Sequence, residues 1–169
     1  MSGSEFSHFI DPRQVTERPV HLAASEAERK ALARRFALVS IGRLEASVTL
    51  VANGEAVDVR GRLSADVVQS CAISGDDLAV SIDEPLVLRF VPEKPIAVEE
   101  LELDAGELDE IPYSGAMFDL GEAVAQGLAL AIDPYAEGPN ADKVRKDVGL
   151  ADGESGGPFA ALKALKKDL

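Results

Sequence analysis

Alternation of apolar and polar residues in three consecutive segments, 44–52, 57–67 and 78–90, constrains the fold of this 169-residue chain more than any other feature. A period of two places apolar side chains on one face of a β-strand and polar side chains on the other. Successive strands of this kind pair as an antiparallel sheet with one buried and one wet face. The segments therefore predict an antiparallel β-meander or a partial barrel.

The connections between these segments carry turn signals. Asn53-Gly54 is typical of a tight hairpin, because both residues tolerate a positive φ. A second turn is expected near Gly75-Asp76. Pro85 has no N–H to donate, so it predicts a bulge or a sheet edge within the third segment.

Two other segments have helical spacing. Residues 25–36 begin with Ser25 and Glu28 in the relation of a capping box. Residues 119–132 begin with Asp119, whose carboxylate suits the positive end of a helix. Both segments carry an apolar stripe, so we expect two helices that cover one face or one end of the sheet. The predicted fold class is α+β.

The ends of the chain differ in composition from this domain. We expect a flexible leader over residues 1–17, the α+β domain over 18–136 and a Gly- and Asp-rich flexible linker over 137–157. Residues 158–169 predict an amphipathic helix. Three residues of its apolar stripe are candidates for docking onto a partner: Phe159, Leu162 and Leu165. The pattern leaves open whether this helix packs on the domain or is free.

The net charge of −13 at pH 7 hides a gradient along the chain. Residues 13–43 carry seven basic and three acidic side chains, whereas residues 93–122 carry one lysine and ten acids. Such a surface can steer a basic partner to one end and an anionic partner to the other, although both charged segments are also typical of solvated surface. The candidates for RNA contact are Arg29, Lys30, Arg34 and Arg35. The candidates for contact with a basic protein are Glu99, Glu100, Glu102, Asp104 and Glu107.

Residues typical of catalysis are few. The two histidines, His8 and His21, lie far in sequence from Cys71, the only cysteine, and no phosphate-binding loop motif occurs. We therefore expect neither an enzyme nor a cofactor. No apolar run approaches the ~18 residues of a membrane span, and no signal peptide is evident, so we expect a cytoplasmic protein. The oligomeric state is left open.

Four stretches in order along the chain resemble one family. They are ERKALARRFALVS, VRGRLSADVVQSCAISGDDLAVSIDEPLVLRF, FDLGEAVAQGLALAIDPY and PFAALKAL. Together they are similar to the YceD family of large ribosomal RNA subunit accumulation proteins, over about residues 18–169. The resemblance implies a cytoplasmic factor in large-subunit ribosome biogenesis that binds a ribosomal protein or the rRNA precursor. A metal-dependent RNA-processing hydrolase that uses the acidic segment is the alternative.

The resemblance also bears on Cys71. Many members of that family carry C-x-x-C at this place and a second cysteine cluster after the helix that here ends in DPYAEG, which implies a structural zinc site. In this chain Ser74 stands at the second position, and no cysteine follows Asp133-Pro134-Tyr135. The chain is thus a variant that lacks the cysteine clusters. We expect no zinc and interpret Cys71 as a structural residue at the end of a strand.

Overall fold

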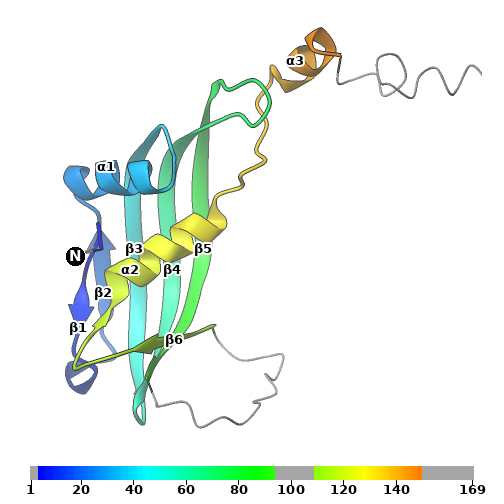
Figure 1. Ribbon diagram of the computed structural model, residues 1–169. Helices are drawn as coiled ribbons and strands as arrows, with labels where there is room; N and C mark the ends of the chain where they lie inside the picture. The colour runs from blue at the N-terminus through cyan, green and yellow to red at the C-terminus, as the bar shows by residue number, and fades with distance from the viewer. Residues whose placement is uncertain (1–3, 94–108, 150–169) are drawn as a thin grey trace, which may run out of the picture. The chain divides into compact units, whose positions relative to one another are not determined.

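The computed structural model describes residues 4–93 and 109–149 (Figure 1). The described residues divide into two compact units. Unit 1 contains the residues up to Val68 together with Ala79–Ile132, and unit 2 contains Gln69–Leu78 together with the residues from Asp133 on. The elements in chain order are β1 (Phe9–Ile10), η1 (Pro12–Gln14), β2 (Pro19–Ala23), α1 (Glu26–Arg35), β3 (Ser40–Asn53), β4 (Ala56–Ser70), β5 (Asp77–Pro92), β6 (Asp109–Tyr113), β7 (Phe118–Asp119), α2 (Leu120–Ala131) and α3 (Ala141–Asp147).

A five-stranded sheet in the order β2-β3-β4-β5-β6 dominates the fold. β2 and β4 both pair with β3 in antiparallel fashion, whereas β6 pairs with β5 in parallel. The three alternating segments form β3, β4 and β5 as neighbours, and the predicted α+β class is confirmed. In the described part of the chain the sheet is open, with β2 and β6 at its edges. β6 pairs only from Leu88 onward, so Pro85 lies where β5 has no described strand on its second side.

The hairpin between β3 and β4 turns at Gly54-Glu55, because Asn53 still pairs with Ala56. The turn therefore lies one residue later than the Asn53-Gly54 turn that the sequence predicts. Gly54 has a φ of 64° and takes the first central position of the turn, where a glycine suits a type II′ hairpin.

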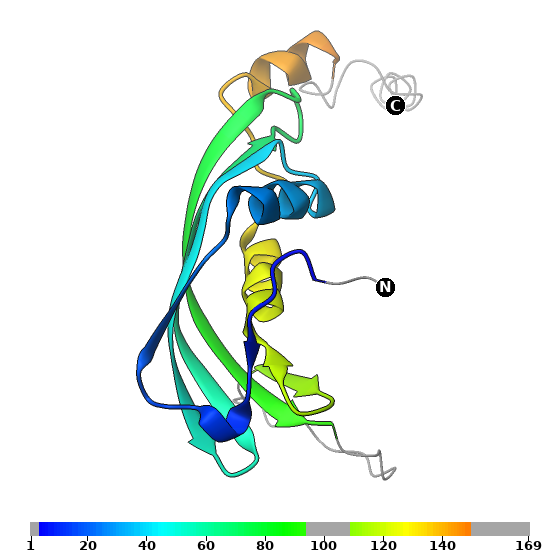
Figure 2. The same ribbon diagram turned by 90° about the vertical axis from the view of Figure 1, so that its left-hand side faces the viewer.

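Helices α1 and α2 cover the same face of the sheet in unit 1, as Figure 2 shows. The alternating residues of the strands point to this face, so that Leu44, Val59 and Leu63 are buried. α2 contributes Leu120, Val124 and Leu128 to the same core. Removing such side chains from water stabilises the fold by about 1.5–3 kcal/mol each. The core therefore lies in a single layer between the sheet and the two helices.

Gly61 interrupts the apolar alternation at the centre of β4, where it lies opposite Val48 of β3. A Cβ atom built on Gly61 would lie 2.0 Å from the carbonyl oxygen of Ser47 and 2.6 Å from the Cα atom of Val48. The two strands approach so closely here that no side chain fits. Glycine at this position therefore allows the sheet to bend toward the helices, as seen in Figure 2.

The segments outside the predicted domain contain structure of their own. The sequence favours a flexible leader over 1–17, whereas the structure pairs β1 with β7 and buries the side chain of Phe6. It favours a flexible linker over 137–157, whereas α3 forms within that range in unit 2. The amphipathic helix over 158–169 lies outside the described residues.

Candidate functional site

The basic helix predicted over residues 25–36 forms as α1 and begins with the expected cap. The Ser25 hydroxyl accepts the N–H of Glu28, and the Glu28 carboxylate accepts the N–H of Ser25 at 2.7 Å. The first turn carries acids and the last turn carries Arg34 and Arg35, an order that complements the helix dipole. Only Leu32 and Ala33 of this helix are fully buried, so most of its surface faces solvent.

A sharp turn after α1 brings the next residues back along the helix. Ala37 has a φ of 53°, and the N–H of Leu38 donates to the carbonyl of Ala33 at 2.8 Å, as in a Schellman motif. The N–H of Val39 then donates to the carbonyl of Val68 on β4 at 2.8 Å. This turn creates an open groove of about 490 Å³ between α1 and the start of β3. We call it the α1 groove; its lining residues are Glu26, Arg29, Lys30, Ala33, Arg34, Leu38, Val39, Ser40 and Ile41.

Three of the four predicted RNA-contact residues line the α1 groove. Arg34 is exposed and makes no ion pair with any described residue. Arg29 donates one guanidinium N–H to the carbonyl of Ala24 at 2.7 Å, which leaves its other donors unused. Lys30 pairs with Glu26 across one helical turn at 2.5 Å, and the lysine lowers the pKa of that carboxyl. Both side chains of this pair face solvent, so a competing anion can displace Glu26 at small cost.

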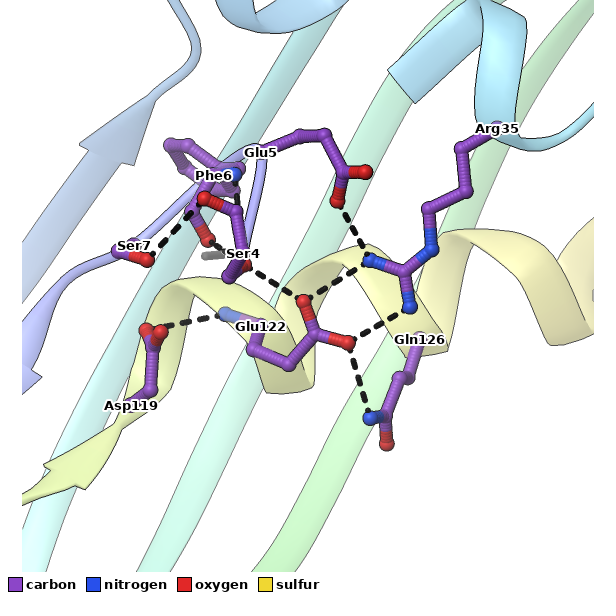
Figure 3. A network of polar contacts seen from close by, with 8 residues as sticks. All are labelled: Ser4, Glu5, Phe6, Ser7, Arg35, Asp119, Glu122 and Gln126. Carbon is purple, nitrogen blue, oxygen red and sulfur yellow. Dashed lines mark hydrogen bonds and ion pairs between the residues drawn. The ribbon is translucent and has the colours of Figure 1, made fainter. Parts of the chain in front are cut away.

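Arg35, the fourth predicted residue, is engaged within unit 1 (Figure 3). Its guanidinium donates to Glu122 on α2 at 2.7 and 3.0 Å and to Glu5 at 3.0 Å. Ser4 donates its hydroxyl to the same Glu122 carboxylate at 2.6 Å, and Gln126 donates to it at 3.1 Å. We call these residues the Arg35 network. The network joins α1, α2 and the N-terminal segment. Arg35 would have to give up these hydrogen bonds to contact RNA, whereas Arg34 would not.

The Arg35 network strongly favours the ionised form of Glu122. The hydrogen bonds from the Arg35 guanidinium, helped by those from Ser4 and Gln126, lower the pKa of Glu122 to about 2 against the opposing effect of burial. The hydrogen bonds to the Glu122 carboxylate in turn raise the pKa of Arg35. No local sequence pattern indicates this role, because Glu5 and Glu122 lie 30 and 87 residues away from Arg35.

Cys71 lies in unit 2, where it joins two loops. Its buried Sγ accepts the N–H of Ser74 at 3.4 Å and that of Gly138 at 3.2 Å. The N–H of Ala72 donates to the carbonyl of Ala136, and Asn140 donates to the Asp76 carboxylate at 3.0 Å. The loop that contains C-x-x-S therefore lies against the loop after Asp133, the two places where the resemblance implies cysteine clusters.

The side chains around Cys71 do not fit a zinc ion. A structural zinc site needs four ligands, commonly thiolates or imidazoles, and Cys71 is the only thiol of the chain. Its sulfur already accepts two backbone N–H groups. Among the described residues, no three His, Cys, Asp or Glu side chains are grouped so that they could hold a metal ion. In this variant, hydrogen bonds to one sulfur connect the loops.

The stability of unit 2 is expected to depend on the ionisation of Cys71. The N–H of Gly138 and the donors of Ser74 and Ile73 lower the pKa of Cys71 to about 6, from 9.0 for a free thiol. A lowered pKa in the folded state stabilises the fold fully above pH 9, and this contribution is lost as the pH falls to about 6. As the pH is raised from 6 to 9, the urea midpoint of unfolding of the native protein should therefore increase relative to that of Cys71→Ser. A difference that stays constant over this range contradicts the prediction.

The remaining predicted contact residues lie outside the described part of the chain. These are the acidic residues Glu99, Glu100, Glu102, Asp104 and Glu107 and the apolar residues Phe159, Leu162 and Leu165. The structure also adds residues that the sequence analysis missed, namely the apolar floor of the α1 groove, which includes Leu38, Val39 and Ile41. Their role depends on the turn at Ala37, and an alanine gives no signal of a positive φ.

Comparison with known proteins identifies one family. The family model described as "Large ribosomal RNA subunit accumulation protein YceD" matches residues 59–166, more than half of the chain. No curated protein and no solved structure matches the chain. Among the described residues, no helix is long and apolar enough to cross a membrane.

Proposed function

Because the chain belongs to the YceD family, whose name assigns it a role in the accumulation of large-subunit ribosomal RNA, we propose that it is a non-enzymatic factor that binds a component of that subunit. The proposed component is a basic ribosomal protein, held by the acidic segment within residues 93–122, or the rRNA precursor itself. Binding of this kind supports rRNA accumulation because a bound precursor or a delivered ribosomal protein promotes assembly.

The separation of charge in unit 1 is the observation that carries this proposal. Figures 1 and 2 both place α1 and β6 toward opposite ends of the sheet. The exposed cations Lys30 and Arg34 lie at the end with α1, and the exposed acids Asp109 and Glu110 lie at the end with β6, which they begin. Residues 93–122, which include β6, carry ten acids and one lysine. A net charge of −13 makes protein capture the favoured mode, because a basic partner is attracted from a distance.

Neutralising the acidic segment is expected to reduce protein capture. The variant carries Glu99→Gln, Glu100→Gln, Glu102→Gln and Asp104→Asn, and the tagged full chain is used to capture partners from its own cells. The yield of a basic large-subunit ribosomal protein should fall at least severalfold, since the attraction depends on these charges. The matched control neutralises four exposed acids elsewhere: Glu17, Asp77, Glu84 and Asp147.

The control variant has the same net charge, so it separates a local surface from a general charge effect. Equal loss of capture in both variants would show that the acidic segment has no special role. Deletion of the gene should lower large-subunit rRNA relative to small-subunit rRNA, and the native chain should restore it. Unchanged rRNA levels after deletion would refute the proposed function as a whole.

A further inference from the structure

We propose that the α1 groove binds single-stranded RNA, with phosphates on its cationic rim and a base on its apolar floor. This inference rests on the proposed function and names one partner and its site. The groove is formed by described residues of unit 1 alone, and none of its lining residues belongs to the acidic segment 93–122 that is proposed to hold a protein.

The rim of the α1 groove supplies the donors that a phosphate needs. Lys30 and Arg34 are four residues apart and therefore lie on one face of α1, separated by about one helical turn. Arg29 adds a guanidinium that retains free N–H groups. An arginine binds phosphate with two parallel hydrogen bonds, whereas lysine acts as a point charge. Two or three consecutive phosphates can thus be neutralised along this helix.

The floor of the α1 groove favours an unpaired base over a duplex. Val39 is 50 % exposed although it is apolar, and Leu38 and Ile41 lie beside it. In a duplex the base faces are stacked on one another and cannot reach such a floor. A volume of about 490 Å³ is in the range of small-ligand sites, so it suits one or two nucleotides.

An anionic partner fits the α1 groove, and the chemistry of the family favours RNA over an acidic protein. The family is named for the accumulation of ribosomal RNA, a polymer with one phosphate per nucleotide. The rest of the chain is strongly acidic and repels RNA, so contact is confined to this face and involves few phosphates. For two to three phosphates on a single strand, the logarithm of affinity should fall with the logarithm of salt concentration with a slope of about −1.4 to −2.1.

The test measures the binding of a fluorescein-labelled 12-nucleotide RNA to the full chain by anisotropy over a range of salt concentrations. The native chain should bind with a Kd on the order of 10⁻⁵ M and bind the matched RNA duplex more weakly. Lys30→Gln with Arg34→Gln should weaken binding at least tenfold and reduce the salt slope to about −0.7, the value for the one contact that remains at Arg29. Val39→Ser should weaken binding about threefold and leave the salt slope unchanged, because it makes the floor of the groove less apolar but removes no charge.

The matched control is Arg18→Gln with Arg60→Gln, which removes two exposed cations outside the groove and should change affinity less than twofold. The inference is overturned if the double variant Lys30→Gln with Arg34→Gln binds RNA as tightly as the native chain. It is also overturned if this variant still binds RNA but no longer binds an acidic protein. If RNA binding fails while capture of a ribosomal protein persists, the groove assignment falls and the proposed function stands. If the groove binds RNA as expected but deletion leaves rRNA unchanged, the proposed function falls instead.

Discussion

Replacing Gly61 by alanine is expected to destabilise unit 1 by more than about 3 kcal/mol, a large part of the stability of an ordinary domain. The new Cβ would lie 2.0 Å from the carbonyl oxygen of Ser47 and 2.6 Å from the Cα atom of Val48. Both are backbone atoms, so no side-chain rotation can relieve the clash. The strands must separate at the centre of the sheet, where Val48, Val59 and Leu63 are buried. Urea unfolding followed by far-UV circular dichroism measures the loss.

Gly42→Ala is the matched control for this prediction, since it adds the same methyl group to the neighbouring strand β3. A Cβ atom there meets only the carbonyl oxygen of Asp66 at 3.6 Å, an ordinary contact distance. This substitution should be neutral or slightly stabilising, because alanine restricts the unfolded chain. If both variants unfold at the same urea concentration, the close approach at Gly61 is not a constraint on the fold.

Glu122→Gln is expected to lower the free energy of unfolding by about 2 kcal/mol at pH 7. This loss follows from the pKa of Glu122, which the Arg35 network lowers to about 2, and it is reduced by water screening because the ion pair is partly exposed. A lowered pKa stabilises the fold above the unfolded-state value of 4.5, and the contribution is lost as the pH falls through about 2. The difference between the native chain and the variant should therefore shrink between pH 4.5 and 2.

Asp83→Asn provides the comparison for the Arg35 network. Asp83 also pairs with an arginine, Arg62, at 2.9 Å, but both side chains are largely exposed. Its loss should change stability very little, because water screens such a pair. A double-mutant cycle of Arg35→Ala and Glu122→Gln should give a coupling of about 1–2 kcal/mol at pH 7. Additive effects of the two substitutions would mean that the ion pair does not stabilise unit 1.

The sequence predicted the elements whose signals are local. Alternation indicated β3, β4 and β5, and the caps at Ser25 and Asp119 marked the starts of α1 and α2, because each pattern lies within its own element. β2, β6 and the two-residue strands β1 and β7 were not predicted. They are too short for a visible period, and their partners are distant in the sequence.

The candidate site could be predicted only in part. A helical pattern identifies four cations on α1 but cannot separate Arg34 from Arg35, although they are adjacent. Their difference arises from Glu5 and Glu122, which the fold brings to Arg35. The groove floor depends on a positive φ at Ala37, for which glycine would have been the usual signal. Likewise, the contact of Gly138 with the Cys71 sulfur joins residues 67 positions apart.

The pairing of β1 with β7 has a consequence for the order of events during synthesis. The N–H of His8 donates to the carboxylate of Asp119, which lies 111 residues later in the chain. At ordinary rates of translation, residues 4–10 wait on the order of ten seconds before this partner has been made. The strands β2 to β5 can pair as they emerge, because each lies beside the strand that follows it in the chain. The side chain of Phe6 thus stays open to chaperones and proteases until α2 has been synthesised, and it becomes inaccessible only when the rest of the core is in place.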